Sequence, residues 1–196
     1  MLNRFIEVFR RELRGRLRIW LGWGALIVLI PFIWRDPTIE GVLLIFFGAS
    51  IRVWASGYIE KESRLCTDGP FRFSRNPLYL GSLLMTVGAF VSQRFFVGAF
   101  VALVASLLVY RPLILAEEAV LREKFGREFE DYCARTGRFL GFPSIGKSFF
   151  SGFSFKLFRK NSGWEPITVA SFMVVSLLVV HELKEYWFGG QPFDLF

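Results

Sequence analysis

Long apolar runs alternate with short polar segments along the whole chain. Five such runs stand out, at about 19–34, 40–57, 78–91, 95–115 and 167–183. Each is close to the length at which an α-helix crosses the ~30 Å hydrocarbon core of a bilayer. The third run is short and contains glycine, which fits a tilted helix or one partly buried in protein. The pattern predicts an all-α integral-membrane protein with about five transmembrane helices.

The polar segments refine this arrangement. The third and fourth runs are separated by Ser92-Gln93-Arg94 alone, so 78–115 is predicted to form a tight helical hairpin. Residues 1–18 place apolar side chains at helical spacing and arginines on the remaining surface, which is typical of a helix lying on an anionic leaflet. A cleaved signal peptide is the alternative. Glu7, Glu12 and the lack of a small-residue cleavage site argue against it.

Composition and charge placement support a single membrane domain. With 53% hydrophobic residues in 196, a soluble domain of this length has too little interior for its apolar surface. Lys and Arg gather in 1–18, 58–77 and 117–163, so we expect the N-terminus and both long loops in the cytoplasm and the C-terminus on the opposite side. The net charge of +7 is then explained by topology and contact with lipid, and no nucleic-acid partner is predicted.

Several kinds of chemistry are disfavoured by what the sequence lacks. Cys66 and Cys133 stand in no CxxC or ligand spacing, so neither a disulfide framework nor a zinc site is predicted. His181 is the only histidine, which argues against a histidine-based triad or a multi-histidine metal centre. The chain has no GxGxxG or Walker motif, and a Rossmann-type nucleotide site is not indicated. We predict no metal site.

The first polar stretch with candidate chemistry is "GPFRFSRNPLYLG", residues 69–81. Asn76 and Pro77 indicate a helix N-cap followed by proline at the first helical position. Arg72 and Arg75 have two interpretations. They anchor the loop to phospholipid headgroups, or they hold an anion near the helix N-terminus, where free backbone N–H groups favour negative charge.

The second stretch follows the fourth apolar run. Placing the carboxylates of Glu117 and Glu118 beside a membrane costs free energy unless they are hydrogen-bonded, paired with a cation or open to a water-filled cleft. Pro112 is expected to bend this helix, and Arg111 lies two turns before Glu118 on the same face. The alternative is an ordinary helix exit in which Glu118 pairs with Arg122 at i,i+4. The spacing alone does not distinguish a functional site from an ordinary end of a membrane helix.

Residues 121–132, "LREKFGREFEDY", predict a helix, a break at Gly126 and a second helix ending near Gly137. Phe125, Phe129 and Tyr132 share one face of this segment. That face either packs against the membrane domain or stacks on the ring of a ligand.

Taken together, "GPFRFSRNPLYLG", the hairpin, "EE" and "LREKFGREFEDYC" resemble the isoprenylcysteine carboxyl methyltransferase and phospholipid methyltransferase superfamily. The resemblance covers about 65–143. It implies an integral-membrane enzyme that transfers a methyl group from S-adenosylmethionine to a lipophilic or membrane-embedded acceptor. It also implies a cofactor site on the cytosolic side. Around this core the domain would comprise the surface helix 1–18, two spans in 19–57, a connector 144–166, a further span 167–183 and a tail 184–196.

The resemblance implies site residues in this chain. Arg75 and Glu118 are the candidate catalytic residues, with Glu118 as the base if the acceptor is an amine. The candidate cofactor-binding residues are Arg72, Asn76, Pro77, Tyr79, Gly81, Glu117, Phe125, Gly126 and Tyr132. Asn76 departs from the family pattern, in which many members have histidine. The span 167–183 is not explained by the motif, and it either completes the bundle or a substrate tunnel, or mediates association.

The methyl acceptor is left open between the carboxylate of a prenylated cysteine, the amine of a phospholipid and another lipid-soluble molecule. Two other functions are compatible with the residues. One is a membrane reductase of the sterol-reductase type using NADPH, against which the short chain argues. The other is a non-enzymatic scaffold or lipid-binding protein, in which the Arg and Glu clusters serve as headgroup anchors. The bilayer is the expected partner, and the sequence gives no oligomeric state.

Overall fold

A computed structural model describes residues 36–60, 64–141 and 152–188 of the chain. These residues form helices and connecting loops, without a strand in the described ranges. The predicted surface helix 1–18 and first span 19–34 lie outside the described residues, as do most of the connector before α6 and the end of the tail.

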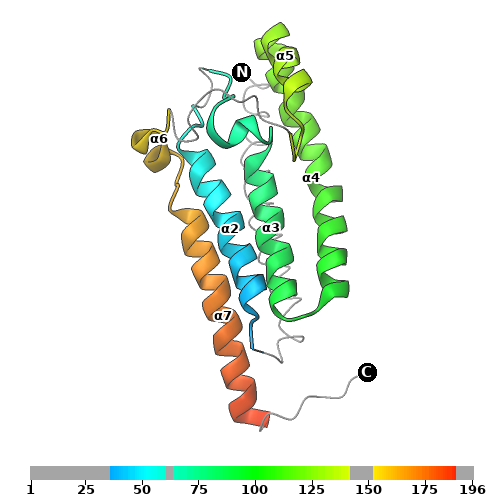
Figure 1. Cartoon of the computed structure of the whole chain (residues 1–196), viewed down its shortest axis with the longest axis vertical. Helices are drawn as coiled ribbons and strands as arrows, with labels where there is room; N and C mark the ends of the chain where they lie inside the picture. The colour runs from blue at the N-terminus through cyan, green and yellow to red at the C-terminus, as the bar shows by residue number, and fades with distance from the viewer. Residues whose placement is uncertain (1–35, 61–63, 142–151, 189–196) are drawn as a thin grey trace, which may run out of the picture.

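Four long helices lie side by side and alternate in direction (Figure 1): α2 Ile39–Ser56, α3 Pro77–Ser92, α4 Phe96–Phe125 and α7 Glu165–Phe188. They correspond to four of the five predicted runs. Three of them, α2, α4 and α7, are long and apolar enough to cross a membrane, whereas α3 has only 16 residues. The all-helical architecture is therefore confirmed for the described residues, which contain three candidate membrane spans, and the count of five spans stays a prediction.

The predicted hairpin 78–115 is present, but its second helix is longer than the apolar run. The α3–α4 turn comprises Gln93, Arg94 and Phe95, with Arg94 at φ +55°. Helix α4 has 30 residues, about 45 Å of helix, so it exceeds a ~30 Å hydrocarbon core. It continues through Pro112 and carries Glu117 and Glu118 inside its last turns. These carboxylates therefore belong to a helix and not to a loop after it.

Helices α2 and α3 make the closest contact in the bundle, because glycines face one another along it. A Cβ atom added at Gly48 would lie 2.5 Å from the carbonyl oxygen of Gly81, and one added at Gly41 would lie 2.3 Å from Cα of Ser92. Small residues let two helix backbones approach in this way within a membrane. Gly81, which the resemblance assigns to the cofactor, thus lies at a helix–helix contact.

Helix α7 packs on the other side of α2. Ala170, Met173 and Leu177 are buried in one core cluster with Ile45 and Ala49 of α2. Near the opposite end of this contact, Arg52 of α2 donates to Ser82 of α3 and lies 3.9 Å from Glu165 of α7. The span 167–183 therefore completes the helical bundle, which is one of the three roles considered for it.

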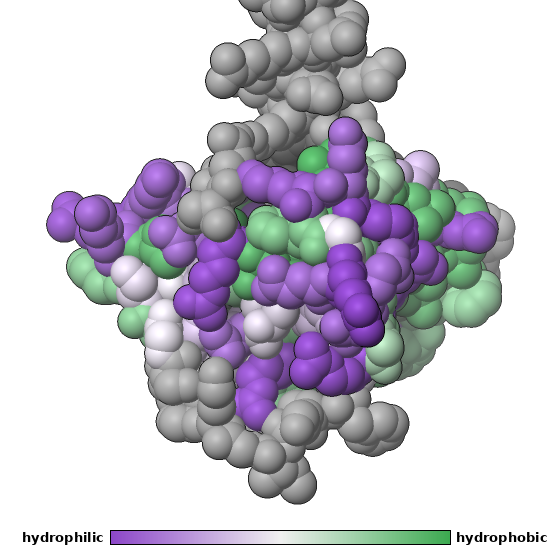
Figure 2. Space-filling model, turned by 90° about the horizontal axis from the view of Figure 1, so that it is seen from above, coloured by the Kyte–Doolittle hydropathy of each residue, from purple (hydrophilic) through white to green (hydrophobic). Residues whose placement is uncertain are grey.

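The shorter elements gather at one end of the bundle: the 3₁₀ helix η2 Gly69–Arg72, α5 Arg127–Arg135 and α6 Phe155–Lys160 (Figure 1). Seen from that end, the surface is largely hydrophilic, with hydrophobic side chains toward its edges (Figure 2). The two polar segments that the charge distribution predicts on one side of the membrane therefore do lie at the same end of the molecule.

Candidate functional site

The segment before α3 runs along the segment after α5. The backbone N–H of Arg75 donates to the carbonyl of Gly137 at 2.9 Å, and that of Asn76 donates to the carbonyl of Arg138 at 3.2 Å. Ser74 Oγ donates to the same carbonyl of Arg138 at 3.0 Å. Residues 62 positions apart in the sequence are thereby held in register at the start of α3.

Asn76 and Pro77 begin α3 as predicted, with Pro77 at the first helical position. The capping prediction for the Asn76 side chain is wrong. Its Nδ2 donates to the carbonyl of Arg138 at 3.2 Å, and it makes no capping bond to α3. An amide can donate to a distant carbonyl as readily as it accepts from its own helix. Asn76 therefore joins two segments of the site.

Arg75 is largely buried and crosslinks three elements. Its Nη2 donates to Glu118 Oε1 of α4 at 3.0 Å, and its Nη1 donates to the carbonyls of Cys133 and Thr136 at 3.0 and 2.9 Å. Only 11% of the side chain is exposed. A headgroup anchor would present its guanidinium to solvent and lipid phosphates, so for Arg75 the anchoring interpretation does not hold.

Glu118 is the centre of this network, with 5% of its side chain exposed. Besides Arg75, it accepts from Arg138 through Nη2 at 2.9 Å and through Nε at 3.1 and 3.2 Å. The hydrogen bonds to Glu118 raise the pKa of the Arg138 guanidinium above its ordinary value. Two guanidinium groups thus surround one carboxylate, which favours its ionised form.

The local alternative, an i,i+4 pair between Glu118 and Arg122, is wrong. Arg122 instead pairs with Glu130 of α5 on the exposed surface. Arg111, two turns before Glu118, is exposed and makes no ion pair with another described residue. The buried partners of Glu118 come from segments distant in sequence.

Glu117 is held by the same segment that supplies Arg75. The hydroxyl of Tyr79 donates to Glu117 Oε1 at 2.9 Å, and the Tyr79 ring is buried against Tyr110 of α4, with centroids 5.1 Å apart. Each carboxylate of the adjacent pair is therefore bound by a side chain from the first turn of α3 or from the short segment just before it.

The aromatic face of 125–132 is mostly used for packing. Phe129 and Tyr132 are buried in a cluster with Leu65, and the Tyr132 hydroxyl donates to the carbonyl of Phe71 at 2.7 Å. Burial raises the pKa of Tyr132. Phe125 is only half-buried against this cluster, so it retains surface for a ligand. Gly126, at φ +50°, forms the predicted break between α4 and α5 in a conformation that favours glycine.

The family model described as phospholipid methyltransferase matches residues 37–128, a range that contains α2, α3, α4 and the Arg75–Glu118 pair. The cobalt-zinc-cadmium resistance protein CzcN of Cupriavidus metallidurans is 31% identical over 173 residues, covering 83% of this chain and 70% of CzcN. The chain belongs to the phospholipid methyltransferase family. A second relative, the nickel-cobalt-cadmium resistance protein NccN of Alcaligenes xylosoxydans xylosoxydans, is 32% identical over 145 residues, covering 67% of this chain and 66% of NccN.

No solved structure matches the chain. The aligned region spans about two thirds of the length of NccN, and the names of both relatives concern metal resistance rather than a reaction. Membership of the phospholipid methyltransferase family therefore suggests a membrane methyltransferase and identifies neither the reaction nor the methyl acceptor.

Arg138 is the member of this site that sequence reasoning missed. It lies beyond the end of α5, outside the residues quoted for the methyltransferase resemblance, and half of its side chain is exposed. A basic residue just past a predicted helix end is too common to mark a site. Arg72, also half-exposed, ends η2 next to this region.

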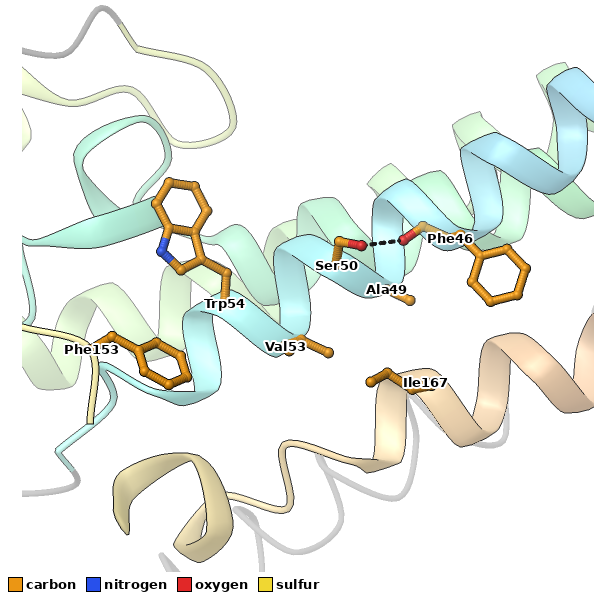
Figure 3. A pocket seen from close by; sticks show the side chains of 7 residues that line it. All are labelled: Phe46, Ala49, Ser50, Val53, Trp54, Phe153 and Ile167. Atoms are coloured by element: carbon orange, nitrogen blue, oxygen red, sulfur yellow. Dashed lines mark hydrogen bonds between the residues drawn. The ribbon is translucent and has the colours of Figure 1, made fainter. Parts of the chain in front are cut away.

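A cavity of about 450 Å³ lies between α2 and α7 (Figure 3). Its lining is almost wholly apolar and includes Phe46, Val53 and Trp54 of α2 and Ile167 of α7. The Trp54 ring also contacts Phe73, with centroids 6.1 Å apart. One wall of the cavity thus adjoins the segment that leads to Arg75.

Replacing Glu118 by alanine would leave the buried Arg75 guanidinium without its carboxylate. We expect a loss of about 3–5 kcal/mol in the free energy of unfolding, the usual cost of breaking a buried pair from one side. Arg122→Ala removes the exposed pair with Glu130 and should change the stability far less, because water and salt screen an exposed pair. Thermal unfolding of both variants in detergent measures the difference. Similar small losses would show that Glu118 does not hold the site together.

Proposed function

We propose that this protein transfers the methyl group of S-adenosylmethionine to a lipophilic or membrane-embedded acceptor. The observation that carries the proposal is the cluster of Arg75, Glu118 and Arg138. It joins the start of α3 to the last turns of α4 at one end of an apolar helical bundle. Both parts of the methyltransferase-like motif contribute to it, and the family match includes both.

The residues present fit the cofactor, which combines a carboxylate, hydroxyl groups and a cationic sulfonium. Arg75 Nε is buried and has no acceptor in the described structure, so a donor is available inside the cluster. A buried donor without a partner costs free energy that a bound oxygen would recover. Glu117 accepts from Tyr79 and keeps lone pairs for further donors.

When bound, S-adenosylmethionine supplies an electrophilic methyl group that needs little covalent help from the protein. The cationic side chains of Arg72, Arg75 and Arg138 would hold its carboxylate. Glu117 would accept from its hydroxyl or amino groups, and the half-buried Phe125 is the available ring for stacking. Asn76, Pro77 and Gly126 fix the backbone that positions these side chains.

Glu118 acts as a positioning residue in this proposal. Its two oxygens already accept from two guanidinium groups, which stabilises the charged form and makes the carboxylate a poor proton acceptor. The geometry thus favours orientation of Arg75 and Arg138 over the role of base that an amine acceptor would require. Orientation of the reacting groups is the main protein contribution that methyl transfer needs.

The acceptor would approach from the lipid. We propose that its apolar part occupies the cavity between α2 and α7, whose wall at Trp54 adjoins the Arg75 segment. The carboxylate of a prenylated cysteine and the amine of a phospholipid are the two acceptor classes. Following the charge distribution, we place this end of the bundle in the cytoplasm and the C-terminus on the opposite side.

Calorimetry of the purified chain in detergent tests the cofactor. We expect S-adenosylmethionine and S-adenosylhomocysteine to bind, and Arg75→Lys and Glu118→Gln each to weaken binding at least tenfold, because the fork geometry around Glu118 is lost. The matched controls are Arg64→Ala, which removes an exposed arginine, and Glu123→Gln on the exposed surface of α4. Neither should change the affinity.

Three results of this titration would contradict the proposal. They are no binding of either S-adenosyl compound, binding of NADPH in their place, or equal losses in the site and control variants. NADPH binding would favour the reductase alternative. Absence of all three ligands would favour a lipid-binding protein.

The names of the two relatives, which concern metal resistance, suggest a physiological role for the proposed activity. We propose that the methylated membrane component contributes to tolerance of divalent transition cations. Cells expressing the chain and supplied with methyl-labelled methionine should accumulate label in a membrane-extractable molecule and tolerate more cobalt. Both effects should be lost in Glu118→Gln and kept in Glu123→Gln. Incorporation of the methyl label without any change in cobalt tolerance would support methyl transfer and contradict the proposed role in metal tolerance.

A further inference from the structure

At the end of the bundle away from Arg75, the last turns of α7 bring three potential metal ligands together. One ligand atom each from His181, Glu182 and Glu185 lies within 4.8 Å of the others. His181 and Glu185 are four residues apart and so share a face of the helix. We predicted no metal site from the sequence because the chain lacks cysteines in ligand spacing and a second histidine, and this group needs neither.

A fourth group comes from a different part of the chain. Asp36, which precedes α2, places Oδ1 3.4 Å from Nδ1 of His181. A carboxylate beside Nδ1 favours the imidazole tautomer protonated there, which leaves the Nε2 lone pair for a metal ion. The imidazole is 15% exposed and therefore fixed against the bundle, whereas both glutamates are exposed.

The two glutamates converge without a basic partner among the described residues. Neither Glu182 nor Glu185 makes an ion pair or hydrogen bond with another described residue. Carboxylates held this close repel one another, and a bound cation would convert that repulsion into attraction. Glu118 and Glu130, by contrast, are each paired with an arginine.

We propose that His181, Glu182 and Glu185, with Asp36 beside the imidazole, bind one divalent transition cation such as Co²⁺ or Zn²⁺. One imidazole nitrogen with carboxylate oxygens suits ions of intermediate softness better than Mg²⁺, which prefers oxygen ligands alone and keeps its water. Metal–ligand bonds of ~2.0–2.2 Å place tetrahedral ligands roughly 3.3 Å apart, so the site closes by rotation of the exposed glutamates. The bound cation would tie the end of α7 to the segment entering α2.

Titration of the full-length chain with Co²⁺ tests the site, using detergent-solubilised protein from which any polyhistidine tag has been removed. We expect one ion per chain by calorimetry. The Co²⁺ absorption spectrum should lack the thiolate charge-transfer band that Cys66 or Cys133 would give. His181→Ala and Glu185→Gln should each weaken binding at least tenfold. Glu123→Gln, an exposed carboxylate on the other end of the bundle, should bind as the wild type does.

Glu185→Gln keeps the size of an exposed side chain, so its folding is not in question even if His181→Ala is unstable. Stoichiometric binding that fails in both variants supports the site. The proposal is overturned by the absence of stoichiometric binding, by a thiolate spectrum, or by wild-type affinity in Glu185→Gln. None of these results depends on whether S-adenosylmethionine binds at the opposite end of the bundle.

Discussion

The buried ion pair between Arg75 and Glu118 is the interaction on which the arrangement of this protein's polar end depends. An ion pair removed from water costs several kcal/mol per ion and is stable only where further hydrogen bonds satisfy both partners. Here Nη1 of Arg75 donates to two carbonyls at the end of α5, and the second oxygen of Glu118 accepts from Arg138. The pair therefore requires α3, α4 and the 133–138 segment to be in place together.

The helical bundle sets the positions from which these side chains meet. The glycine contact between α2 and α3 brings the two backbones together and fixes where α3 begins. The additional turns of α4 carry Glu117 and Glu118 past the end of the apolar run to the level of Arg75. A shorter α4 would end before Glu117, and a looser α2–α3 contact would leave the start of α3 free to shift.

The four long described helices begin and end within two residues of the predicted runs, except at the C-terminal ends of α4 and α7. This agreement arises because an apolar run bounded by polar residues marks a membrane helix well. The apolar run 95–115 stops short of the end of α4 at Phe125, although the pattern of 121–132 did predict the break at Gly126 that follows. What the pattern did not predict is that one continuous helix carries Glu117 and Glu118. Local rules predicted a helix cap for Asn76 and offered an i,i+4 pair as one of two alternatives for Glu118. Both are held instead by residues that only the tertiary fold brings near. The family resemblance, and not the spacing of the residues, assigned Arg75, Glu117 and Glu118 to one site. No sequence pattern marked Arg138 as a member of it.

The central claim is that one network, built around Glu118, forms the methyl-donor site. Amide hydrogen exchange with and without S-adenosylhomocysteine tests it most directly, because the backbone N–H groups of Arg75 and Asn76 bond to the 137–138 segment. We expect the ligand to slow exchange in 72–77 and 133–138 together, and Glu118→Gln to abolish both effects. Binding that leaves these two segments unchanged, or protects a different part of the chain, would contradict it.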